Sequence, residues 1–331
     1  MATESSISDT YGPLLTTTLK RVLDSGALHD NIFNNDVLLQ WLRGGNRVKT
    51  VDGGERMRVG IMDSKNTTAK WYADYESLDV TAQSGMTSAF YTWKQGSTSV
   101  SVNGRELRSN KGKARITNLQ QEKISQAAAS LVDIVATGAF SDGSGTGSKQ
   151  MTGLAAMIED VPGTTVGAYA GIPVGNTAWQ NQAATSVGAA AVNLLPKLRT
   201  VYNDCKQGKG GANSSPDMFI TTQSIHESFE ALMYPQVRYQ PNPSSGADAG
   251  IEKLKFKGAD VVWDDYCTSG MMYVLNSNHI TMFVHSDANF SMAEGGFQKP
   301  INQDALVTQI FFQGNLSTDN RRKLGKLAGV T

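Results

Sequence analysis

The sequence predicts an α+β fold, in which helices pack as layers on sheets, and three observations favour it. Helical and strand patterns alternate between residues 191 and 275. Two runs of alternating side chains lie between residues 55 and 93, and one long helical repeat ends near Gly138. A chain of 331 residues is long enough for about two ordinary domains with a sizeable core.

Residues 1–54 are expected to form an N-terminal arm with two apolar segments. The first follows the helical repeat from Tyr11 to Leu23 after Asp9 as N-cap, and the second runs from Val37 to Leu42 and ends at Gly44. Helices this short are marginal in water on their own, so the arm needs a partner surface. The side chains expected to make this contact are Leu14, Leu15, Leu19, Leu38 and Trp41.

Residues 55–96 are expected to form two strands joined by a long loop. Glu55 to Met62 alternates, and a second alternating run places Ala89, Tyr91 and Trp93 on one face. Long loops without structure of their own are usually functional or disordered, and the aromatic residues of this loop favour docking on another subunit. The residues expected to contact a neighbour are Lys65, Lys70, Trp71, Tyr72, Asp74, Tyr75, Glu76 and Asp79.

A basic stretch precedes the clearest helix, which is expected at about residues 117–139 with Thr117 as its cap. The stretch is either a solvated face or a surface that contacts phosphates or acidic protein. It has no interleaved aromatic residues, which disfavours a site that stacks bases. Its members are Arg105, Arg108, Lys111, Lys113 and Arg115.

The segment SDGSGTGSKQ, from Ser141 to Gln150, is expected to be a hinge that marks the main domain boundary. Beyond it the pattern predicts helices at residues 191–203 and 224–233. Strands are predicted at 218–221, 258–263, 271–275 and 306–312. A basic tail with Arg321, Arg322, Lys323 and Lys326 closes the chain.

No catalytic or metal motif is complete, so the sequence predicts neither an enzyme nor a cofactor. His226 and Glu227 would need a second histidine where Glu230 stands. Asp264 and Asp265 follow a predicted strand, and because adjacent strand residues point to opposite faces, they are not expected to form a catalytic pair. The two cysteines, Cys205 and Cys267, are expected to be buried free thiols.

The charge balance and the apolar runs limit the partners. Lys plus Arg and Asp plus Glu number 30 each, so no overall field draws the chain onto nucleic acid. Charged residues make up 18%, against about 25% in a typical soluble domain, which suits a protein covered by copies of itself. With no signal peptide or membrane span in the pattern, we expect synthesis in the cytoplasm and no membrane partner.

The order of these features resembles the major capsid proteins of tailed bacteriophages, which have the fold named for phage Hong Kong 97. The likeness covers nearly the whole chain and consists of distributed patterns. Its segments are GPLLTTTLKRVLDSGALHDNI, the turn from Gly44 to Gly54, FYTWKQGSTSVSVNGRELRSNKGKARITNLQQEKISQAAASL, FSDGSG with KQMTGL, and KPINQDALVTQIFFQGNLSTDNRRK.

The resemblance implies an N-terminal arm (1–54), an extended E-loop (55–96), a discontinuous P domain (97–148 and 286–331) and an A domain (149–285). The helix at about 117–139 would be the spine helix of the P domain. Copies would form hexamers and pentamers of an icosahedral head around double-stranded DNA, assembled in the host bacterial cytoplasm. The implied partners are a separate scaffolding protein, a portal and a decoration protein.

Alternatives remain at this point. An encapsulin-like compartment shell shares the fold, and a decoration or tail protein would form no closed shell. An N-terminal scaffolding segment was either cleaved or replaced by a separate protein, and Lys65 and Lys70 are candidates for cross-linking by location. We also hypothesise that Asp74, Glu76 and Asp79 lie over a neighbour's Arg105, Arg108 and Lys111, because their charges are opposite.

Overall fold

The computed structural model describes residues 36–109, 119–164, 167–206, 215–237, 254–293 and 295–331. Within these ranges the chain divides into two compact units. One contains Gly96–Val135 and Asp287–Phe312, and the other contains Asn35–Gln95, Ala136–Ser286 and Gln313–Thr331. The expected arm contacts Leu14, Leu15 and Leu19 lie outside the described residues, as do Thr117, Lys111, Lys113 and Arg115.

A six-stranded sheet forms the centre of the larger unit. In sheet order its strands are β7 (Gln182–Ala184), β14 (Gly325–Ala328), β11 (Met271–Leu275), β8 (Met218–Thr221), β10 (Ala259–Trp263) and β9 (Leu254–Phe256). All side chains of β8 and β14 are buried, as expected for central strands covered on both faces. The strands predicted at 218–221 and 271–275 are confirmed at their predicted bounds.

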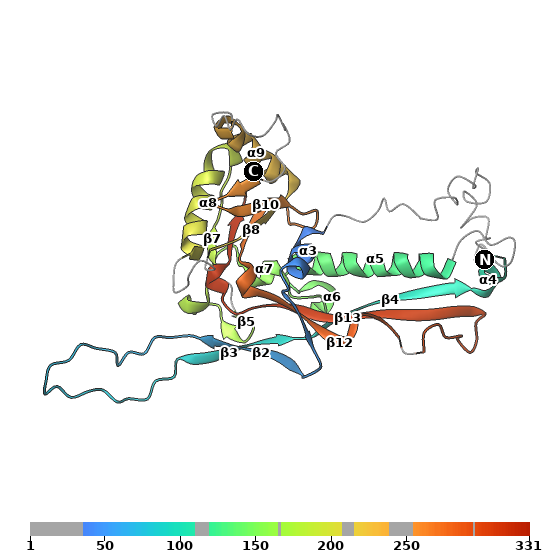
Figure 1. Ribbon diagram of the computed structural model, residues 1–331, viewed down its shortest axis with the longest axis horizontal. Helices are drawn as coiled ribbons and strands as arrows, with labels where there is room; N and C mark the ends of the chain where they lie inside the picture. Colours follow the sequence, from blue (N-terminus) through green and yellow to red (C-terminus); the bar gives the residue numbers. More distant parts are fainter. Residues whose placement is uncertain (1–35, 110–118, 165–166, 207–214, 238–253, 294) are drawn as a thin grey trace, which may run out of the picture. The chain divides into compact units, whose positions relative to one another are not determined.

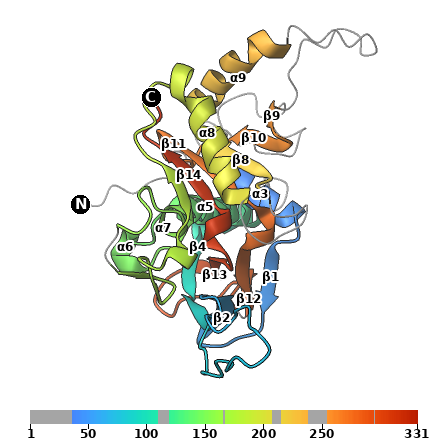
Figure 2. The same ribbon diagram turned by 90° about the vertical axis from the view of Figure 1, so that its left-hand side faces the viewer.

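Two helices cover this sheet and complete its core (Figure 2). They are α8 (Ala190–Lys206), which contacts β7 and β14, and α9 (Gln223–Val237), which contacts α8 and β10. Leu194, Leu198 and Val201 of α8 pack in one cluster with Phe219 and Phe229. Gly325 permits the close approach of α8, because a Cβ there would lie 2.6 Å from Val201 Cγ1. Both predicted helices are confirmed.

The structure corrects the expectation of a basic tail. Arg321, Lys323 and Lys326 are buried, and only Arg322 of the four basic residues is exposed. Lys326 lies in β14, which pairs with both β11 and β7. The end of the described chain therefore returns to the sheet formed by strands from residues 182–275.

A long hairpin also belongs to the larger unit (Figure 1). Its strands, β2 (Arg56–Met62) and β3 (Met86–Thr92), pair antiparallel from Arg56 with Thr92 to Met62 with Met86, as the alternating pattern predicts. Residues 63–85 form the loop between them. Tyr91 is buried at the base of the hairpin and donates a hydrogen bond to the Thr318 carbonyl at 2.7 Å, while burial raises the pKa of Tyr91 to about 12.

A second sheet has the order β1-β12-β13-β4, formed by β1 (Val48–Val51), β12 (Ile280–Met292), β13 (Ala305–Thr318) and β4 (Lys94–Asn103). The long helix α5 spans Leu119–Phe140, as predicted within two residues at each end. Both β12 and β13, and also α5, contribute residues to both units. Ile134 of α5 is 53% exposed, although the helical repeat placed it on the apolar face.

The remaining elements are short. They are α4 (Gly104–Ser109), α6 (Gly145–Ser148), α7 (Leu154–Met157), β5 (Ala168–Tyr169) paired with β6 (Ile172–Pro173), and the 3-10 turns η2 (Thr177–Trp179), η4 (Ser277–His279) and η5 (Arg321–Lys323). The helix α6 lies within the segment 141–150, and the role of this segment as a hinge stays a prediction.

The second apolar segment of the arm is the helix α3 (Val37–Gly44), and its N-terminus is capped by two carboxylates. Asp36 accepts a hydrogen bond from the Leu39 amide at 2.9 Å. Buried Asp264 accepts bonds from the amides of Val37 and Leu38 at 3.0 and 3.1 Å. Leu38 is fully buried in its own chain, so its contact is made inside the subunit, while Trp41 is half-buried.

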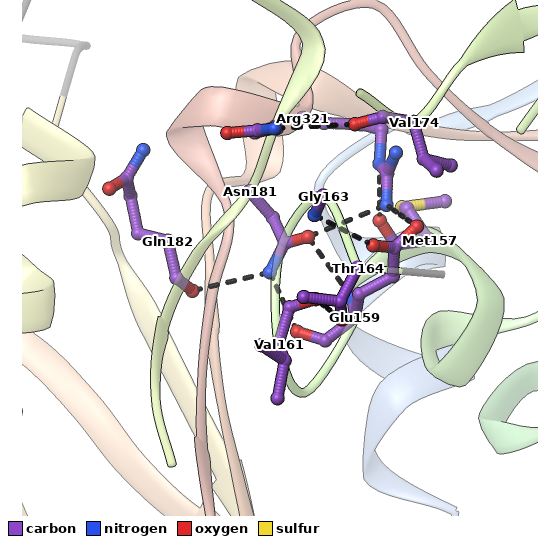
Figure 3. Close-up of polar contacts among 10 residues, drawn as sticks. Met157, Glu159, Val161, Gly163, Thr164, Val174, Asn181, Gln182 and Arg321 are labelled. Atoms are coloured by element: carbon purple, nitrogen blue, oxygen red, sulfur yellow. Dashed lines mark hydrogen bonds and ion pairs between the residues drawn. The ribbon is translucent and has the colours of Figure 1, made fainter. Parts of the chain in front are cut away.

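A buried arginine joins distant parts of the larger unit (Figure 3). Arg321, 1% exposed, donates to the Met157 carbonyl at 2.7 Å and pairs with Glu159 Oε1 at 3.2 Å. Asn181 accepts a bond from the Glu159 amide at 3.1 Å and returns one to the Glu159 carbonyl at 2.9 Å. The guanidinium also lies 4.7 Å from the centre of the Tyr169 ring. This network fixes the chain around Glu159.

Replacing Arg321 with Met should lower the free energy of unfolding of the chain by about 3–5 kcal/mol, because Glu159 would then be a nearly buried charge without its partner. Urea denaturation measures this difference. The matched control is Arg322→Met, which removes an exposed charge and should change the same free energy by less than about 0.5 kcal/mol. Equal losses in the two variants would contradict the role given to Arg321.

The caps of α3 predict a pH dependence of stability. Burial raises the pKa of both Asp36 and Asp264 above 3.8, and a neighbouring carboxylate raises each further. Protonation of these two carboxyls therefore stabilises the folded chain. This stabilisation is complete below pH 3.8 and is lost progressively as the pH rises through the folded pKa values. The free energy of unfolding of the wild type minus that of Asp264→Asn, measured by urea titrations, should fall as the pH rises above about 4. A rise over this range would show that the sign is wrong.

Candidate inter-subunit surfaces

The end of the loop between β2 and β3 is held by hydrogen bonds of its own. We name residues 70–77 the loop tip. Lys70 Nζ pairs with Glu76 Oε1 at 2.7 Å and donates to the Ser77 carbonyl at 3.0 Å. The Ala73 amide donates to Glu76 Oε2 at 3.3 Å, and the Glu76 amide donates to the Ala73 carbonyl at 3.0 Å. The tip is therefore a closed turn.

The two legs of the loop are also joined. The Asp63 amide donates to the Gly85 carbonyl at 2.9 Å, and Thr67 Oγ1 donates to Gln83 Oε1 at 3.0 Å. Asp79 accepts bonds from the hydroxyl and amide of Thr81, and these bonds lower the pKa of its carboxyl. Local polar contacts thus give the loop a shape although it has almost no apolar core.

The loop tip displays three aromatic side chains to solvent. Trp71 and Tyr75 are fully exposed, at 100% and 104% of the reference area, and Tyr72 is 66% exposed. Leu78 and Val80 beside the tip are exposed too. Clustered exposed apolar side chains mark interaction surfaces, whereas scattered ones need no explanation. The prediction that these aromatics contact a neighbour stays a prediction, and their exposure leaves them available for it.

The hypothesis of charge pairing between subunits stays a prediction, and two of its members have partners inside the chain. Glu76 already pairs with Lys70, and Arg108 pairs with Asp304 at 2.6 Å. The hydrogen bond from Arg108 lowers the pKa of the Asp304 carboxyl. Arg105, Lys65 and Asp74 are exposed. Charge pairing with a neighbour through Glu76 or Arg108 would therefore compete with a contact inside the chain.

A face without charged side chains lies on β4 and β13. Val100, Val102, Ile310 and Phe312 are buried on one side of these strands, and the opposite side is exposed. Gln95 Nε2 donates to Gln313 Oε1 at 3.2 Å, which shows that the outward residues of the two strands share a side. We name the outward residues Ser97, Ser99, Ser101, Gln309 and Phe311 the uncharged face. Sequence reasoning missed it, although the alternation of Ser and Val in STSVSV signals it.

The described residues offer little for catalysis or metal binding. Across the described ranges, no three His, Cys, Asp or Glu side chains gather as metal ligands would, and no helix is both long and apolar enough to cross a membrane. His279 Nδ1 lies 2.7 Å from Asp319 Oδ1. Cys205 and Cys267 are buried free thiols, as predicted, and burial raises the pKa of Cys267 to about 12.

Solved structures similar to this chain include two capsids and an encapsulin. The capsid of cyanophage A-1(L) matches with a TM-score of 0.69 at 15% identity, covering 92% of this chain and 96% of that chain. The capsid of a native GTA particle matches at 0.58 and 12%, with coverages of 92% and 95%. The SrpI encapsulin of Synechococcus elongatus matches at 0.54 and 12%, with coverages of 94% and 95%. The comparisons with family models and with curated protein sequences found no match.

At these identities the likeness is one of fold, and it extends over more than nine tenths of the chain. The observed elements also follow the predicted order, from the hairpin with its long loop through the long helix to the layered sheet and the returning strand. The chain therefore has an α+β structure with the Hong Kong 97-type capsid fold.

Proposed function

We propose that this chain is the major capsid protein of a tailed bacteriophage. It has a structural role, in which copies form the hexamers and pentamers of an icosahedral head that encloses double-stranded DNA. The observation that carries the proposal is the exposed aromatic loop tip on a chain with this fold. Residues 55–96 serve as the E-loop, residues 97–148 and 286–331 as the P domain, and residues 149–285 as the A domain, except that β14 at the end of the chain pairs into the sheet of the A domain.

The loop tip contacts a second copy of the chain. Permanent interfaces bury about 2,000–5,000 Å² and place aromatic side chains at their centres, and Trp71, Tyr72 and Tyr75 are free to fill that role. The contact is heterologous, because a loop of one copy meets a different surface of the next. Such contacts close into rings when the rotation between copies matches.

The surface that receives the loop tip is the uncharged face of the neighbouring copy. Interface centres are depleted in charge, and the outward residues Ser97, Ser99 and Ser101 with Gln309 and Phe311 carry none. Small serine side chains leave room for aromatic rings, and Phe311 offers an apolar contact. The basic stretch is then available for phosphates of packaged DNA, which must be met locally because the whole chain is neutral.

The remaining partners follow from this role. A separate scaffolding protein, a portal and a decoration protein complete the head, which assembles in the host cytoplasm. A second candidate function is an encapsulin-like compartment, because the SrpI encapsulin is among the similar structures. The contents of purified particles distinguish the two, since a phage head holds DNA and a compartment holds protein cargo.

The double variant Trp71→Ala/Tyr75→Ala should fold normally and fail to form shells, because the removed rings touch solvent in the free subunit. Electron microscopy and sedimentation of the purified protein measure shell formation, and urea denaturation checks the fold. The control Ile301→Ala removes an equally exposed apolar side chain elsewhere and should assemble. Shells at wild-type protein concentrations from the double variant would refute the role of the tip.

Three substitutions at Ser99 test the uncharged face. Ser99→Ala should assemble, whereas Ser99→Lys and Ser99→Glu should both reduce shell yield at least about tenfold, because either charge would be desolvated under the neighbour's tip. Particle yield on a sucrose gradient gives the measurement. A face turned toward DNA would tolerate Lys and reject Glu, and a face left in solvent would tolerate both, so either pattern argues against this contact.

A further inference from the structure

We propose that the Lys70–Glu76 pair is a clamp that holds the loop tip in the conformation bound by a second copy. The inference rests on the proposed function and assigns to these two residues a positioning role inside their own subunit. Sequence reasoning had given both to the neighbour.

The clamp closes a ring of contacts around the three aromatic residues of the loop tip. Lys70 reaches across the turn to Glu76 at 2.7 Å and to the Ser77 carbonyl at 3.0 Å. The other carboxylate oxygen of Glu76 accepts the Ala73 amide at 3.3 Å. Trp71, Tyr72 and Tyr75 all lie between the two ends of this ring in the sequence, so their backbone is fixed on both sides.

A fixed backbone at the tip matters because no other segment in the described part of the chain covers the tip. Its aromatic side chains are exposed, so apolar packing contributes nothing to its shape before association. A tip without the clamp would have to lose backbone freedom on binding, which weakens every contact it makes. Each copy uses one tip, so a small loss per contact is repeated over the whole shell.

Asp74 provides a matched comparison within the same turn. It carries the same charge as Glu76 and is exposed, but none of the contacts that close the ring passes through it. Removing the charge of Asp74 therefore tests the effect of loop charge alone. Removing that of Glu76 tests charge and clamp together.

The experiment uses the full-length unassembled protein and two readouts. Chymotrypsin cleavage after Trp71, Tyr72 and Tyr75, followed by mass spectrometry, reports local order of the tip. Light scattering reports the rate of shell assembly. The variants are Glu76→Gln, the charge exchange Lys70→Glu/Glu76→Lys, and the control Asp74→Asn.

We expect Glu76→Gln to raise the cleavage rate about two- to fivefold, the factor that an exposed ion pair is worth, and to slow assembly. The charge exchange should partly reverse both effects, because it restores the ion pair without the hydrogen bonds to the backbone. Asp74→Asn should leave the cleavage rate unchanged, because no contact of the ring passes through Asp74.

The outcomes separate this inference from the proposed function. Unchanged cleavage in Glu76→Gln overturns the clamp. Faster cleavage with normal assembly overturns the claim that the clamped conformation is the bound one. Equal cleavage rates in Asp74→Asn and Glu76→Gln overturn the clamp too, since loop charge alone would then account for the local order of the tip. Failure of the proposed contact itself shows separately, as normal assembly of the Trp71→Ala/Tyr75→Ala variant.

Discussion

The buried guanidinium of Arg321 is the interaction on which the larger unit depends. It binds the chain at Met157 and Glu159 and stacks on Tyr169. Tyr169 meets Tyr91 edge to face at 6.1 Å, and Tyr91 binds Thr318 three residues before Arg321. The base of the long hairpin is thus attached to the same network, through Tyr91 and through the bond from the Phe90 amide to the Ala170 carbonyl. A charge this deeply buried is tolerated only because its partners are all in place.

The sequence predicts the elements of this fold far better than its polar contacts. Periodicity located β8, β11, α8 and α9, because their apolar spacing reflects burial directly. Arg321 was assigned to a basic tail, because its partners lie more than 100 residues away in the sequence and a local run of basic residues ordinarily indicates a solvated surface. The sequence predicted no catalytic pair at Asp264, and it could not predict that Asp264 caps α3, because that contact spans 226 residues.

The sequence also predicts some features of the candidate surfaces and misses others. The aromatic loop was predicted from its composition, because rings in a long polar loop lack a partner in their own chain. The internal pairing of Lys70 with Glu76 has a short sequence separation, yet it follows no helix or strand rule and needed the folded turn to be seen. The alternation of Ser and Val in STSVSV indicates the β4 half of the uncharged face, but only the sheet order shows that β13 lies beside it.

The hairpin and the sheet differ in how far apart their paired residues lie, and this sets an order of events in time. Hairpins form in about 1–10 microseconds, because their strands are neighbours in sequence. Pairing β1 with β12 or β7 with β14 requires the closure of long stretches of chain, which is slow. A newly made chain therefore presents its exposed aromatic loop before its sheets are complete. Under the proposed function, chains that meet early bind through the loop tip before they are folded, so the yield of correctly folded subunits depends on how long folding chains remain apart.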